Sequence, residues 1–117
     1  MTSYRILFDS ADRAAASYTA GIGNEGFAGC HVIADLTAGA GSVVVHIEAL
    51  DPATGNYYPL LTSASLSGSG TTVLRVHPFL TAAANTVAQD GLPEKTRVRA
   101  VVSGGNLTFS VGCNLVD

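Results

Sequence analysis

Apolar and polar residues alternate with a period of two in several short segments of this chain, and Gly, Pro, Asn and Asp separate the segments. In segment 30–36 the apolar side chains that share one face are Cys30, Val32, Ala34 and Leu36. The segments that repeat this pattern are 43–49, 57–66, 71–76, 96–102 and 107–113, with weaker versions at 4–8 and 14–20. This period is that of β-strands with one buried face. The sequence therefore predicts an all-β chain: one compact antiparallel β-sandwich domain over residues 1–117, Ig-like or jelly-roll-like, with about seven or eight strands.

Two pairs of these segments are joined by short glycine-containing turns, which is typical of β-hairpins. We expect segments 30–36 and 43–49 to pair as one hairpin, and segments 96–102 and 107–113 to pair through the turn at residues 103–106. Residues 79–92 have no clear apolar stripe. We interpret them as a long connection between sheets with room for one or two helical turns.

Charge and composition exclude several classes of function. The chain has a formal net charge of -3, and only 13% of its residues are charged. Nucleic-acid binding needs Lys and Arg concentrated on one face, so we expect no nucleic-acid partner. The first residues lack the pattern of a secretory signal, and the apolar runs are too short to span a membrane. We therefore expect a soluble chain with no membrane partner.

The two cysteines, Cys30 and Cys113, fall on inward-facing positions of their predicted strands. We interpret them as small buried apolar residues, with a disulfide between them as the alternative. Together with three scattered histidines they do not give the spacing of a zinc site. We therefore expect neither a metal nor a cofactor.

No motif for catalysis stands in the right context. The string Gly21-Ile22-Gly23-Asn24-Glu25-Gly26 matches GxGxxG, but a β-rich segment follows it instead of the helix that a dinucleotide site needs. Asp35 and His46 would be neighbours across the first expected hairpin, where we interpret them as ordinary surface polar residues. We therefore expect no enzyme.

Aromatic residues beside prolines near strand ends are the better candidates for binding a partner, since aromatic side chains provide much contact area at low entropic cost. They are Tyr57, Tyr58 and Phe79, and their alternative role is to cap the core. Arg75, Arg97 and Arg99 are expected on outward positions, either as ordinary surface residues or as a small basic patch.

The order of these signals from Gly26 onward resembles that of small structural proteins of tailed bacteriophages, namely head decoration (minor capsid) proteins of HK97-like shells. The residues that carry the resemblance are Gly26–Thr37, Val43–Glu48, Asp51–Tyr58, Leu60–Ala64, Gly70–Val76 and Leu92–Ser110. The resemblance covers about three quarters of the chain and rests on strands and turns, without an invariant functional motif.

The resemblance implies a non-enzymatic virion protein that is made in the host cytoplasm and binds and stabilises the capsid exterior. It implies the major capsid protein as a partner and assembly as a dimer or trimer. We predict residues 1–8 as a docking arm, with Arg5 meeting a capsid carboxylate and Phe8 as an apolar anchor. The alternative is a carbohydrate- or receptor-binding β-sandwich of a phage tail, a baseplate or a bacterial surface.

Overall fold

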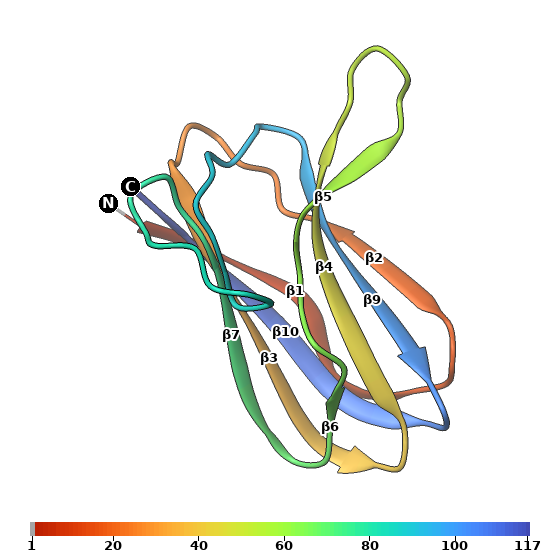
Figure 1. Cartoon of the computed structure of the whole chain (residues 1–117). Coiled ribbons are helices and arrows are strands. Elements are labelled where there is room, and N and C mark those ends of the chain that lie inside the picture. Colours follow the sequence, from red (N-terminus) through yellow and green to blue (C-terminus); the bar gives the residue numbers. More distant parts are fainter. Residues whose placement is uncertain (1) are drawn as a thin grey trace.

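The computed structural model describes residues 2–117, which form ten strands in two packed sheets (Figure 1). Sheet A contains, in spatial order, β1 (Thr2–Arg13), β10 (Leu107–Val116), β3 (Gly29–Gly39), β7 (Gly70–Val76) and β8 (Val87–Ala88). Sheet B contains β2 (Ser17–Gly21), β9 (Thr96–Ser103), β4 (Ser42–Leu50) and β5 (Tyr57–Thr62), while β6 (Leu66–Ser67) also pairs with β4. The predicted all-β sandwich is confirmed. The strands exceed the expected seven or eight because β6 and β8, with two residues each, are too short to show a period.

The core lies between the sheets and is built from every second residue of each main strand, whose side chain faces inward. The burial patterns of β9 and β10 alternate strictly, and that of β3 alternates over most of its length. The largest fully buried side chains are Phe109, Ile22, Ile47, Leu74, Leu107 and Leu115. The period of two thus assigned the buried face of the main strands correctly.

The expected hairpins are wrong, because both turns cross from one sheet to the other. β3 lies in sheet A and β4 in sheet B, and β9 and β10 are divided in the same way. β3 instead pairs with β10 and β7, and β4 pairs with β9 and β5. In these arches the inward side chains of the joined strands face each other across the core, so each strand still buries its apolar face.

The two arches lie against each other at one end of the sandwich. The Gly41 N–H donates a hydrogen bond of 3.0 Å to the Asn106 carbonyl, and the Ser42 and Ser103 hydroxyls are 3.4 Å apart. Glycine is required at this contact, since a Cβ on Gly41 would lie 2.3 Å from the Gly105 carbonyl oxygen.

The connection after β7 crosses from sheet A to sheet B, as predicted, and it contains no helical turn within the described residues. It folds back so that β8 pairs in parallel with the end of β7, and Asn85 adopts a positive φ of 62° in the turn before β8. Within residues 2–117 no helix is long and apolar enough to cross a membrane.

The segment predicted as a docking arm is part of β1, except for Met1, which lies outside the described residues. β1 pairs with β10 from Thr2 opposite Val116 to Arg13 opposite Leu107. The segment is therefore the edge of sheet A and does not project from the sandwich. The register shifts between Ile6 and Phe8, which marks a β-bulge at Leu7.

Candidate docking surfaces

The outer face of sheet A carries a continuous row of apolar positions. The strand register places Ile6 of β1 opposite Gly112 of β10, Gly112 opposite Ile33 of β3, and Ile33 opposite Val73 of β7. We call Ile6, Gly112, Ile33 and Val73 the apolar row. Ile6 is 70% exposed, and Tyr4, two positions earlier on the same face of β1, is 73% exposed.

The centre of the apolar row is hollow because Gly112 has no side chain. A Cβ at this position would have only the Arg5 carbonyl oxygen within 4 Å, at 3.9 Å. Polar residues border the row on both sides: His31 and Arg75 form one neighbouring pair, and Asp35 and Thr71 form the other. An apolar centre with a polar border is typical of protein interfaces.

Arg5 and Phe8, the predicted docking residues, point to the inner side of β1. Arg5 donates hydrogen bonds to the Ser3 hydroxyl and to the carbonyls of Tyr4 and Gly23. The Phe8 ring packs edge-on against Phe109, with 6.4 Å between the ring centroids. The exposed apolar surface of this segment belongs to Tyr4 and Ile6. Their spacing of two was a usable signal, but uninterrupted alternation would also place Phe8 on their face, and the bulge at Leu7 turns Phe8 inward.

The other predicted aromatic contacts do not share one surface. Tyr57 lies under the guanidinium of Arg97, whose central carbon is 3.9 Å from the ring centroid. Tyr58 is the next residue of β5 and is 44% exposed. Phe79, in the connection after β7, is 88% exposed, and its ring is tilted against that of His77. The turn that leads into Tyr57 projects beyond the two sheets (Figure 1).

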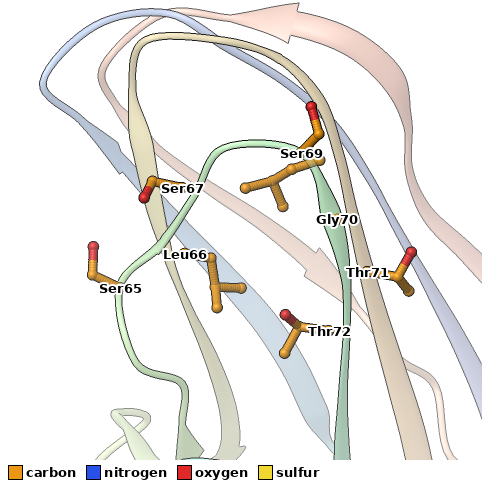
Figure 2. Close-up of a pocket in the computed structure, with 8 residues that line it drawn as sticks. Ser65, Leu66, Ser67, Ser69, Gly70, Thr71 and Thr72 are labelled. Carbon is orange, nitrogen blue, oxygen red and sulfur yellow. The ribbon is translucent and has the colours of Figure 1, made fainter.

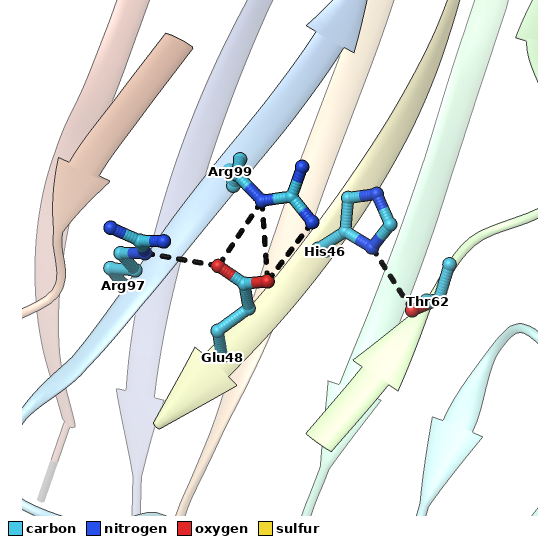
Figure 3. A network of polar contacts seen from close by, with 5 residues as sticks. All are labelled: His46, Glu48, Thr62, Arg97 and Arg99. Carbon is cyan, nitrogen blue, oxygen red and sulfur yellow. Dashed lines mark hydrogen bonds and ion pairs between the residues drawn. The ribbon is translucent and has the colours of Figure 1, made fainter. Parts of the chain in front are cut away.

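The outer face of sheet B carries a polar cluster around Glu48 (Figure 3). Arg97 donates from Nε to Glu48 Oε1 at 3.0 Å, and Arg99 donates from Nη2 to Glu48 Oε2 at 3.1 Å. Burial alone would raise the pKa of Glu48, but the hydrogen bonds and charges of Arg99 and Arg97 outweigh it and lower this pKa below its usual 4.5. The outward orientation predicted for both arginines is confirmed, while Arg75 lies on the opposite outer face of the sandwich.

His46 belongs to the same face of β4 and contacts Thr62 of β5, with 3.1 Å between Nδ1 and the hydroxyl. Burial and then the charge of Arg99 lower the pKa of His46, against the opposing effect of Glu48. The expected neighbourhood of Asp35 and His46 is wrong, because the two residues lie in different sheets. Asp35 accepts a hydrogen bond from the Thr71 hydroxyl instead.

Cys30 and Cys113 are buried, free thiols on neighbouring strands of sheet A. Cys113 is paired with Val32 and Cys30 with Leu115, so the two cysteines are diagonal neighbours on the inward face. The hydrogen bond with Cys113, followed by burial, raises the pKa of the Cys30 thiol far above its usual range. Cys30 is therefore protonated at neutral pH.

Two shallow pockets lie at opposite parts of the sandwich. One, of about 250 Å³, is lined mainly by serine and threonine side chains, with Leu36, Leu66 and Gly70. Figure 2 shows Leu66 of β6 and Thr72 of β7 on its two sides. The other, of about 400 Å³, is lined by residues 24–27 of the glycine-rich loop between β2 and β3 (residues 22–28), together with Leu92 and Glu94. Within residues 2–117 no three His, Cys, Asp or Glu side chains gather to hold a metal ion.

The glycine-rich loop is held by a residue whose structural role the sequence pattern did not reveal. Asn24 is 2% exposed, and its amide donates hydrogen bonds to the carbonyls of Phe27 and Leu92. Its side-chain oxygen accepts from the Phe27 N–H. This part of the GxGxxG string therefore fixes a loop against the core.

No protein-family model matches this chain, and no curated protein matches it. It is similar to a chain of a solved structure described as "Structure of infectious bursal disease virus Gx strain", with a TM-score of 0.49 and 8% sequence identity. The match covers 97% of this chain and 31% of that chain, so this chain spans less than a third of the other's length.

Proposed function

We propose that this chain is a non-enzymatic structural protein of a virion, of the head decoration class that it resembles. In this proposal the outer face of sheet A binds the exterior of the capsid shell, and the major capsid protein is its partner. The observation that carries the proposal is the exposure of Ile6 in the apolar row and of Tyr4 beside it. Large apolar side chains grouped on one face of a soluble protein are typical of an interaction surface.

The shape of this face suits docking on a shell. Sheet A presents extended strands, and Gly112 leaves space between Ile6 and Ile33 for a side chain of the partner. Burying apolar surface stabilises a complex by about 25 cal/mol per Å². The apolar row and Tyr4 form a small patch, so each copy binds weakly once the entropic cost of association is subtracted.

A repeated shell converts such weak contacts into stable attachment. A dimer or trimer of this chain, as the resemblance implies, would engage several capsid subunits at once, and linked contacts gain affinity through their effective concentration. The tail or baseplate location is an outcome of the first test below. We favour the shell over a carbohydrate-binding module, since no described group of aromatic side chains forms a stacking surface for a sugar.

The first test is the number of copies of this chain per virion, measured by quantitative mass spectrometry on purified particles. We expect roughly one-third to one copy per major capsid subunit, because the symmetry of the shell repeats the docking site. A handful of copies would place the chain in the tail or baseplate. Absence from virions would refute the structural role.

The second test is co-sedimentation of the purified chain with shells that lack it. Gly112→Arg fills the apolar row without strain, since Gly112 has an ordinary φ and open space around its missing Cβ. We expect this variant and Ile6→Ser to lower binding at least tenfold. Phe79→Ser is the control, because it removes an even more exposed apolar side chain outside the row. Loss of binding in the control alone would place the interface elsewhere.

A further inference from the structure

Arg97 is held in one orientation on the outer face of sheet B. Its Nε donates to the Glu48 carboxylate, and its guanidinium carbon lies over the Tyr57 ring, 3.9 Å from the ring centroid (Figure 3 for the ion pair). The Glu48 side chain is itself only 7% exposed, so this anchor is fixed by the sheet. Glu48 and Tyr57 already restrain this guanidinium through its Nε and one of its faces. It therefore loses little conformational entropy when its two terminal nitrogens bind a ligand.

The remaining edge of Arg97 has no partner within the described part of the chain. Arg97 makes one hydrogen bond to another described residue, through Nε, which leaves Nη1 and Nη2 unengaged. Arg99 uses Nε and Nη2 on Glu48. The Arg97 side chain is 28% exposed, so part of it is accessible to a second molecule.

The charge of this surface is positive in a protein whose net charge is -3. Two arginines share one carboxylate, and His46 is neutral at pH 7 because its pKa is lowered. The neighbouring outward residues in the register are uncharged: Ser17, Thr19, Gly21, Val44, Thr62 and Val101. Lys95, an exposed residue two positions before Arg97, adds positive charge at the start of β9. A small positive charge of this kind suits a carboxylate better than a polyanion, which the acidic protein as a whole repels.

We propose that the outer face of sheet B binds a glutamate or aspartate side chain of an acidic segment in a partner protein, with Arg97 Nη1 and Nη2 donating to the two carboxylate oxygens. The planar fork of arginine matches a carboxylate in this way. This surface lies on the opposite side of the sandwich from the apolar row. The inference therefore stands whether or not sheet A docks on a shell.

The test is an NMR titration of the ¹⁵N-labelled chain with an end-blocked octapeptide of alternating Glu and Thr. The matched peptide has Gln in place of Glu. We expect chemical-shift changes confined to β4, β5 and β9 with the Glu peptide, and at least fivefold weaker binding of the Gln peptide. Equal binding of the two peptides, or changes centred on sheet A, would overturn the proposal.

Variants test the role of the fork separately from that of charge. Arg97→Lys keeps the positive charge and loses the bidentate geometry, so we expect roughly a fivefold to tenfold loss of Glu-peptide affinity. Tyr57→Leu removes the ring that supports the guanidinium and is expected to weaken binding in the same direction. Arg75→Gln is the control, because Arg75 lies on the other outer face. The amide spectrum of each variant verifies its fold.

Three further outcomes would also refute the proposal. Unchanged affinity in Arg97→Lys would mean that charge alone attracts the peptide. Inorganic phosphate that binds this face more tightly than the Glu peptide would identify a phosphate site. Shifts that depend on protein concentration and disappear in Arg97→Lys without any peptide would identify a second copy of the chain as the occupant.

Discussion

Glu48 is only 5% exposed although it lies on the outer face of a sheet. The aliphatic parts and guanidinium groups of Arg97 and Arg99 flank it on β9, and they supply its hydrogen bonds. A carboxylate is tolerated in such a place only when charged donors replace the lost water. The cluster therefore links β4 to β9 in the middle of sheet B.

We predict that Glu48→Gln lowers the free energy of unfolding by about 1–3 kcal/mol, because it leaves two neighbouring arginines without a counter-charge. Urea denaturation measures this difference. Glu94→Gln is the control, since Glu94 is exposed and makes no hydrogen bond or ion pair with another described residue. A loss of the same size in both variants would mean that net charge, and not the cluster, sets the stability.

At the scale of the strands, the sequence predicted which faces are buried but not which strands pair. Alternation in 30–36 and 43–49 is the same whether the two strands form a hairpin or an arch, because both arrangements bury the same side chains. The turns contain glycine in either case. Pairing of β3 with β10 and of β4 with β9 joins segments far apart in the chain, and no local signal identifies such partners.

The same limit applies to the candidate surfaces. Glu48 and Arg97 are 49 residues apart, so their contact could be recognised only after β4 was known to pair with β9. The apolar row likewise draws one residue from each of four strands. Outward orientation of Arg97 and Arg99 was predictable from the period of two, whereas the residues opposite them were not.

The contact between the two arches yields a prediction for Gly41. Gly41→Ala places a methyl group 2.3 Å from the Gly105 carbonyl oxygen, and both groups belong to backbones fixed by the hydrogen bond from Gly41 to Asn106. One arch must move, so we expect the free energy of unfolding to fall by about 1–3 kcal/mol. Thermal and urea denaturation measure the change.

Gly91→Ala is the matched control for the arch contact. A Cβ on Gly91 would have no other atom within 4 Å, and the φ of Gly91 is ordinary. Alanine there is therefore expected to be neutral or to stabilise by about 0.4–1 kcal/mol through the unfolded state. If Gly41→Ala were as stable as Gly91→Ala, the two arches would not be in close contact.

At the scale of the whole molecule, titrating groups on both outer faces make stability depend on pH in the same direction. Burial, followed by the charges of Arg75 and His77, lowers the pKa of His31 on sheet A. Burial and Arg99 lower the pKa of His46 on sheet B. The unfolded chain therefore binds protons at these histidines at a higher pH than the folded chain, so stability rises with pH across this range.

We predict that the melting temperature is highest above pH 7 and falls as the pH drops through the usual histidine pKa of 6.5 toward the lower pKa of the folded state. A second fall begins near pH 4.5, because the lowered pKa of Glu48 stabilises the fold only while the carboxylate is ionised. His31→Gln and His46→Gln should each flatten the first fall and leave the second in place. His31 lies on sheet A and His46 on sheet B. The reduction of the first fall in each variant therefore shows how much the protonation of that histidine destabilises the protein. A melting temperature that rises between pH 7 and pH 5 would contradict the lowered pKa of both histidines.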